Sequence, residues 1–141
     1  DYSHTPDSLE NMLKTAKEFV EGRIITVFGC GGDRDKMKRP IMGEIAGRLS
    51  DFCVITSDNP RSEDPDSIID DIEPGTAKTG CGYVKIPDRR EAIFYAIKMA
   101  GPNDFVAVAG KGHEDYQIFA DRTIHFDDAE VIAEAFKEKE K

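Results

Sequence analysis

The residues best suited to chemistry in this chain lie in the segment Asp58 to Arg61, directly after the apolar run from Phe52 to Thr56. The arginine guanidinium is a planar fork that matches a carboxylate, which a lysine ammonium does not reproduce. Pro60 keeps Asn59 out of the helical region, so the amide is held in an extended pose. The segment indicates a carboxylate-reading loop, although an Asn-Pro pair by itself more often marks only a turn.

A second polar loop, Gly29 to Lys36, follows another short apolar run and contains Arg34. Its glycines let a ligand approach the backbone closely. It is not a phosphate-cradling P-loop, because no Gly-Lys-Ser/Thr follows at the required spacing, and it lacks the third glycine of the dinucleotide fingerprint. A tight strand-to-helix turn with solvated charges explains this loop equally well when it is taken alone.

A third loop, Gly110 to Asp115, places two glycines around a lysine and exposes backbone amides. Glu114 can accept a hydrogen bond from an ammonium group. His113, Glu114 and Asp115 are unsuited to a metal site, because adjacent residues rarely point at one centre. We therefore expect no metal here, interpret His113 as an orienting or solvated group, and assign His125 a structural role.

The elements that must position these loops alternate between strand and helix. Apolar β-branched runs predict strands at 24–28, 52–56, 83–86 and 105–109, and helical periodicity predicts helices before, between and after them. The first helix should extend to about Val20, and Pro74-Gly75 should end the third. Residues 117–119 and 123–126 predict a terminal antiparallel hairpin. The pattern indicates an α/β fold with a Rossmann-like, doubly wound, mostly parallel sheet.

In such sheets ligands bind outside the carboxyl ends of the strands, so the three loops should open on one edge. Together they offer two guanidiniums, an amide, a carboxylate and bare backbone amides. This inventory suits a zwitterionic ligand, such as an amino-acid head group. The sequence therefore predicts one composite site rather than three separate turns.

Length and composition limit the number of domains and the classes of function that this chain can have. A length of 141 residues predicts a single domain over 1–141, and a net charge of −9 argues against nucleic-acid binding. No apolar run approaches the roughly 20 residues of a membrane helix, and the start of the chain lacks a signal segment, which together predict a cytoplasmic protein. The odd count of three cysteines favours free thiols, with Cys30 as the one candidate reactive thiol. The start without Met predicts a chain cut at a domain boundary.

The quoted loops, in this order, resemble the C-terminal domain of the Mur ligases of peptidoglycan synthesis, and most closely the members that add meso-diaminopimelate. The matching segments are 1–7, 28–40, 58–61 and 109–116. The resemblance implies that Asp58, Asn59, Pro60 and Arg61 recognise meso-diaminopimelate. It also implies that Arg34 joins Arg61 around the distal carboxylate, and that Gly110 and Glu114 contact the distal amino end.

The family reaction, as the resemblance implies it, uses ATP and Mg²⁺ to activate the D-glutamate carboxyl of UDP-N-acetylmuramoyl-L-alanyl-D-glutamate as an acyl phosphate. The amino group of diaminopimelate then attacks. The P-loop, a carboxylated lysine and the uridine-nucleotide site belong to two preceding domains of the family that lie outside this chain. The isolated domain should therefore be inactive.

Four further residues have nucleotide-edge roles by resemblance. Asp1 and His4 match a hinge motif near the nucleotide ribose, although Ser3 replaces the usual alanine. Lys36 and Arg39 would face the ATP phosphates on closure, or would simply be surface charges of a helix. A free-standing amino-acid or nucleotide binding module is the alternative function, and a purely structural domain ranks last because it leaves the polar loops unexplained.

Overall fold

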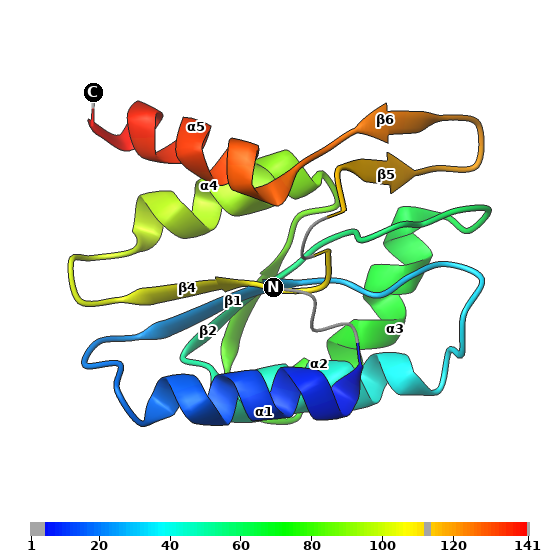
Figure 1. Ribbon diagram of the computed structural model, residues 1–141. Helices are drawn as coiled ribbons and strands as arrows, with labels where there is room; N and C mark the ends of the chain where they lie inside the picture. The colour runs from blue at the N-terminus through cyan, green and yellow to red at the C-terminus, as the bar shows by residue number, and fades with distance from the viewer. Residues whose placement is uncertain (1–4, 112–113, 141) are drawn as a thin grey trace.

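A computed structural model gives the structure of residues 5–111 and 114–140, which form three layers with a parallel sheet in the middle (Figure 1). The elements are, in chain order, α1 (Pro6–Lys17), β1 (Ile24–Phe28), α2 (Lys38–Leu49), β2 (Phe52–Ile55), α3 (Pro65–Ala77), β3 (Gly82–Lys85), α4 (Arg89–Met99), β4 (Phe105–Val108), β5 (Tyr116–Ile118), β6 (Thr123–His125) and α5 (Asp128–Glu140).

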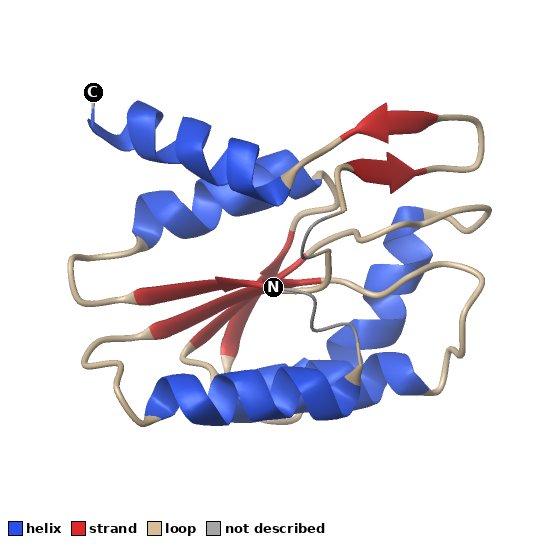
Figure 2. Cartoon of the chain, viewed as in Figure 1, coloured by secondary structure: helices blue, strands red, loops and turns tan. Residues whose placement is uncertain are grey.

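The central sheet has the order β3-β2-β1-β4, and all three neighbouring pairs are parallel. Its direction of growth reverses between β1 and β4, which is the topological switch point of a doubly wound sheet. Helices α1, α2 and α3 cover one face, and α4 and α5 cover the other (Figure 2). The predicted α/β class and its mostly parallel sheet are confirmed.

Strand β1 shows why the sheet must be covered on both sides. All five of its residues are buried, and successive side chains enter opposite cores. Ile24 and Phe28 pack with helices α1 to α3, whereas Ile25 and Val27 pack with α4 and α5. A continuous apolar run of this length is typical of a strand in a parallel sheet with helices on both faces.

The predicted end of the third helix at Pro74-Gly75 is wrong, because α3 continues through Pro74 to Ala77. Proline removes one helical hydrogen bond, but packing against α2 compensates for the loss. A Cβ built on Gly75 would lie 1.9 Å from the Pro40 carbonyl oxygen, so the two helices meet at this glycine. Helix α1 is also shorter than predicted and ends at Lys17.

The hairpin of β5 and β6 forms a separate antiparallel sheet, as predicted. It lies beside the loop after β2, and a backbone hydrogen bond joins the two: the Arg61 N–H donates to the Ile118 carbonyl at 2.9 Å. None of the helices in the described ranges 5–111 and 114–140 is long and apolar enough to cross a membrane.

Candidate functional site at the carboxyl edge of the sheet

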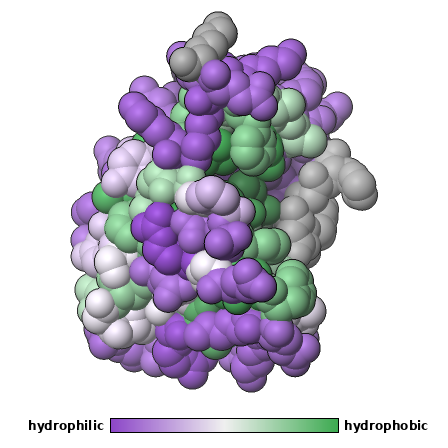
Figure 3. Space-filling model, turned by 90° about the vertical axis from the view of Figure 1, so that its left-hand side faces the viewer, coloured by the Kyte–Doolittle hydropathy of each residue, from purple (hydrophilic) through white to green (hydrophobic). Residues whose placement is uncertain are grey.

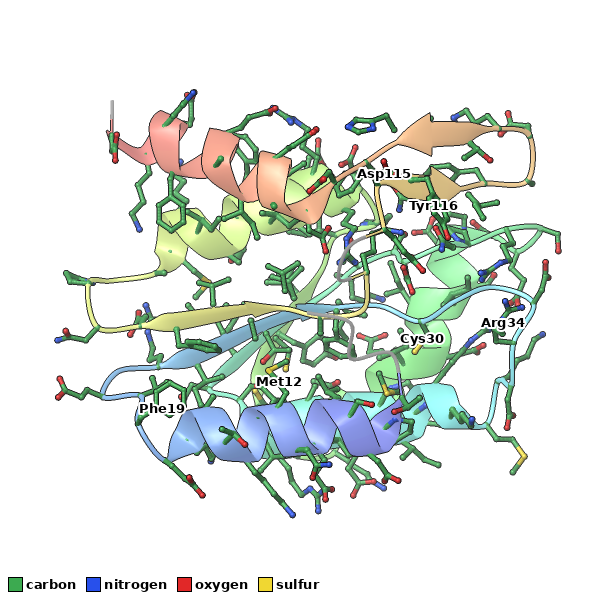
Figure 4. The ribbon with its side chains drawn as sticks, viewed as in Figure 1. Met12, Phe19, Cys30, Arg34, Asp115 and Tyr116 are labelled. Carbon is green, nitrogen blue, oxygen red and sulfur yellow. The ribbon has the colours of Figure 1, made fainter. Side chains whose placement is uncertain are left out.

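The loops that follow β1, β2 and β4 meet at the carboxyl edge of the sheet, on the right of Figure 1. They enclose a cavity of about 630 Å³ beside the switch point between β1 and β4. The residues that line it are Thr5, Gly29, Cys30, Gly31, Arg34, Asp35, Lys38, Arg39, Met42, Asp58, Asn59, Arg61, Gly110, Glu114 and Tyr116. Figure 4 shows Cys30, Arg34 and Tyr116 together on this side of the molecule.

Most of the predicted ligand residues come together in this cavity. Its lining includes Arg34, Asp58, Asn59, Arg61, Gly110 and Glu114. Pro60 is buried behind the lining, and Lys36 is exposed outside it. Asp1 and His4 lie outside the described residues, so the predictions for them stay predictions.

The loops after β1 and β2 are locked together through their backbones. The Gly32 N–H donates to the Asn59 carbonyl oxygen at 2.7 Å. A Cβ on Gly32 would lie 1.7 Å from the Pro60 carbonyl oxygen, so only glycine fits. Arg61 has a φ of 54°, a left-handed conformation that costs a non-glycine residue roughly 1–2 kcal/mol. Backbone strain of this kind clusters at ligand sites, where the surrounding structure maintains it.

The two candidate arginines converge at Gly31. A Cβ built there would lie 2.9 Å from Arg61 Nη1 and 3.5 Å from Arg34 Cγ. Arg61 Nη1 donates to the Gly32 carbonyl at 3.1 Å, which anchors the guanidinium at the cavity wall. Arg34 is exposed and donates from Nη1 to the Asp33 carbonyl at 3.2 Å. The remaining guanidinium donors make this corner of the cavity suitable for a carboxylate.

Lys111 is the central residue that the sequence analysis missed, because it was treated only as a spacer between two glycines. Its side chain is fully buried, and its Nζ lies 3.1 Å from Asp58 Oδ1 and 3.9 Å from Glu114 Oε1. Burial lowers the pKa of this ammonium below its usual value, and the nearby Asp58 carboxylate opposes that shift. A lysine three residues beyond the end of strand β4 is the sequence signal that would have identified it.

Arg39 requires a correction in one respect, because it is not a solvated charge on the helix surface; its role toward ATP stays a prediction. Its side chain is 1% exposed. Nη1 donates to Glu63 Oε2 and Asp71 Oδ2, each at 2.9 Å, and Nη2 donates to Glu63 Oε1 and the Gly31 carbonyl at 2.8 and 3.0 Å. The guanidinium is thus committed to holding the first loop against α2 and α3.

The ATP and Mg²⁺ that the resemblance implies stay predictions for this chain. Arg39 is already paired, and no three His, Cys, Asp or Glu side chains in ranges 5–111 and 114–140 cluster as a metal site would require. We therefore derive no step through ATP or Mg²⁺ from these residues.

Cys30 lines the cavity but does not suit a nucleophile. Burial raises the pKa of its thiol to about 12, and the Arg39 guanidinium only partly opposes this shift. At neutral pH the thiol stays protonated, whereas the thiolate is the reactive form. The interpretation of Cys30 as a reactive thiol is therefore not supported.

Two other cavities lie away from the three loops. One, of about 510 Å³, is bounded by α4, β4 and α5, and its lining is mostly apolar. Figure 3 shows apolar patches that interrupt the hydrophilic surface at one end of the molecule. The other, of about 490 Å³, lies between the hairpin and helices α4 and α5. Neither is lined by residues of the loops that follow β1, β2 and β4, so the three-loop cavity is the candidate site.

The fold and the cavity place the chain in the class of open parallel α/β domains, which commonly bind ligands at the switch point of the sheet. The family model described as "Mur ligase, glutamate ligase domain" matches residues 1–112. The chain therefore belongs to the Mur ligase family.

Individual relatives agree with this assignment. The UDP-N-acetylmuramoyl-L-alanyl-D-glutamate–2,6-diaminopimelate ligase of Caldanaerobacter subterraneus subsp. tengcongensis is 57% identical over the whole chain. Ligase 1 of the same name from Clostridium acetobutylicum is 60% identical over 98% of the chain. A solved structure of a ligase of that name superposes with a TM-score of 0.94 at 43% identity and covers the whole chain. The chain spans 28–29% of the length of these three proteins.

Proposed function

We propose that this chain is the C-terminal, amino-acid-binding domain of an ATP-dependent ligase that adds meso-diaminopimelate to UDP-N-acetylmuramoyl-L-alanyl-D-glutamate. We treat residues 1–141 as one domain of that cytoplasmic enzyme. The convergence of Arg34, Arg61 and Asn59 with Asp58 and Glu114 around one cavity carries the proposal. Cationic donors, amide donors and carboxylates around the same cavity complement a ligand that has both carboxylate and ammonium ends.

The relatives named above supply the substrate class. Their names identify 2,6-diaminopimelate as the amino acid that they add. Diaminopimelate differs from lysine by one distal carboxylate, which Arg61 and Arg34 would bind. With lysine those guanidinium donors would be left without their partner, at a cost of about 1–3 kcal/mol for each unmet hydrogen bond. The cavity would therefore select diaminopimelate over lysine.

The role of this domain in the reaction would be to hold the incoming amino acid. ATP and Mg²⁺, bound mainly by other domains of the ligase, would supply activation of the glutamate carboxyl as an acyl phosphate. In this domain Arg34 and Arg61 would fix the distal carboxylate, while Gly110 and Glu114 would hold the distal amino end. The other amino group would then be directed toward the activated carboxyl group.

Arg61→Ala in the complete ligase tests this proposal. We expect loss of diaminopimelate addition. The dissociation constants for ATP and the UDP-muramoyl-dipeptide should stay within about twofold of the unsubstituted enzyme's, because the Arg61 guanidinium would contact only the amino acid. Arg122→Ala is the matched control, since Arg122 is exposed and its side chain pairs with the adjacent Asp121. Unchanged kinetics for Arg61→Ala would exclude the assignment.

Calorimetry separates the ligase domain from a free-standing binding module. The chain is titrated with meso-diaminopimelate, lysine and ADP in turn. Weak or absent binding by the chain alone is expected of a domain that completes its site with partner domains. Tight binding of any of the three ligands would favour the binding module instead.

A further inference from the structure

The Lys111 ammonium makes its two hydrogen bonds and its ion pair inside the protein. An ammonium group has three donors and no acceptor. Its Nζ donates to Asn59 Oδ1 at 3.0 Å and to the Tyr116 carbonyl at 2.9 Å, and it lies 3.1 Å from Asp58 Oδ1. The side chain is fully buried and does not belong to the cavity lining. Lys111 can thus influence a ligand only through the residues that it holds.

These contacts of Lys111 fix the orientation of the Asn59 side-chain amide. Its Oδ1 accepts from Lys111 Nζ and from the Ile118 N–H, both at 3.0 Å. An amide oxygen has two lone pairs, and these two donors occupy both of them. Neither partner can accept a hydrogen bond, so the amide cannot be turned the other way round. The Asn59 amide nitrogen, a pure donor, is therefore the end left for the cavity.

Asp58 is constrained by the same ammonium. Its Oδ1 is buried, has no hydrogen-bond partner among the described atoms and lies next to Lys111 Nζ. The backbone of Asp58 is also held, because Gln117 Nε2 donates to its carbonyl at 2.8 Å. The buried lysine therefore compensates the Asp58 charge while it sets the direction of the Asn59 amide.

We propose that Lys111 is a positioning residue for diaminopimelate recognition: it orients the Asn59 amide so that its N–H donors face a carboxylate of the ligand. This inference rests on the proposed function. It adds a specificity element, because a reversed amide would present an acceptor and repel that carboxylate. The loop after β4 thereby controls what the loop after β2 can bind.

Lys111→Met in the complete ligase is the first test, since methionine keeps the apolar stem and removes the donors. We expect the KM for diaminopimelate to rise about tenfold or more, the effect of losing a hydrogen bond that involves a charged group, while the KM values for ATP and the UDP-muramoyl-dipeptide stay within about twofold. A merely structural lysine would change all three KM values alike or lower the amount of folded enzyme. Lys98→Met, on an exposed position of α4, is the control.

Asn59→Asp is the second test and does not depend on how well the first variant folds. An aspartate keeps an oxygen toward Lys111 and Ile118 but places a second oxygen where the amide nitrogen faced the cavity. We expect an unchanged or higher unfolding midpoint together with a loss of diaminopimelate affinity of at least about tenfold. Retained or tighter binding would overturn the proposed amide orientation.

Comparison of Lys111→Met with Arg61→Ala distinguishes failure of the positioning role of Lys111 from failure of the proposed function. If Arg61→Ala raises the KM for diaminopimelate but Lys111→Met does not, the proposed function holds and the positioning role is wrong. If neither variant affects diaminopimelate, the proposed function itself is wrong.

Discussion

Gly32 and Pro60 meet backbone to backbone, and this contact joins the loops that follow β1 and β2. A Cβ on Gly32 would lie 1.7 Å from the Pro60 carbonyl oxygen, closer than any unbonded pair of atoms can approach. Gly32 is thus required for space, since its φ is not among the left-handed values. The contact sets the distance between the loop that carries Arg34 and the loop that carries Arg61.

Gly32→Ala should therefore impair ligand binding more than folding. The added methyl group forces the two loops apart, and a misplacement of about 1 Å at a binding site can cost up to ~100-fold in efficiency. We expect kcat/KM for diaminopimelate to fall at least about tenfold in steady-state assays of the complete ligase. Gly101→Ala is the matched control, because its added Cβ would make an ordinary 3.5 Å contact with Asp104 Oδ2. Equal activity of the two variants would contradict the spacing argument.

Arg89 and Asp128 form a buried pair that should contribute to stability rather than to ligand binding. Arg89 Nε and Nη2 donate to the two carboxylate oxygens of Asp128 at 2.8 and 2.7 Å, and Nη1 donates to the Ser57 carbonyl. Arg89→Met should cost about 3–5 kcal/mol in the free energy of unfolding, because it leaves a buried carboxylate without its partner. Urea unfolding measures the loss.

The double variant Arg89→Met/Asp128→Leu isolates the reason for that cost. Removal of both charges should restore part of the stability, since a buried ion pair can often be replaced by apolar residues. Arg48→Met is the surface control, because its contact with Glu10 is exposed and such pairs contribute at most about 1 kcal/mol. A double variant no more stable than Arg89→Met would indicate that the hydrogen bonds from Arg89 to the Ser57 and Ala109 carbonyls, rather than the charge pair, matter most.

The fold could be predicted from the sequence because its signals are local. Strand β1 is a continuous apolar run, and the side chains of Thr5, Asp64 and Asp88 each cap the helix that follows them in the chain. The prediction failed at Pro74, where local propensity favours a helix end but long-range packing of Gly75 on Pro40 keeps the helix going. Tertiary contacts override propensity in such places.

The sequence predicted which residues line the candidate site, but it did not predict the buried ion pairs that hold the loops of the site in place. The strand-end rule placed Arg34, Asn59, Arg61 and Glu114 at one edge, and the structure brings them to one cavity. The partners of Arg39 lie 24 and 32 residues away in the chain. Nothing in the local sequence distinguishes such a buried arginine from a solvated one.

Acid should weaken the fold through Glu63. Its hydrogen bonds from Arg39 hold the pKa of this carboxyl at about 2, below its ordinary value of 4.5. A lowered folded-state pKa stabilises the protein above the unfolded-state value, and this stabilisation is lost as the pH falls from about 4.5 to about 2. Glu63→Gln should therefore be less stable at pH 7, and its deficit should shrink across that window.

Urea unfolding at several pH values from 7 down to about 2 measures this convergence. Asp104, whose pKa the backbone N–H groups of Gly101 and Arg23 also lower to about 2, will keep part of the acid dependence in the Glu63 variant. A stability difference that stays constant over the whole range would show that Glu63 contributes through packing and not through its charge.

Cys30 should resist alkylation although it lies at the cavity. Because burial raises the pKa of its thiol to about 12, only a minute fraction is thiolate at pH 8. Iodoacetamide labelling followed by peptide mass spectrometry should leave Cys30 unmodified in the folded protein and modify it fully in urea. Cys81 is the internal comparison, since it has similar partial exposure and the Cys53 side chain lowers its thiol pKa. We expect Cys81 to be labelled before Cys30. Faster labelling of Cys30 would mean that the Arg39 guanidinium lowers the pKa of the Cys30 thiol by more than burial raises it, so that Cys30 can be modified selectively inside the site.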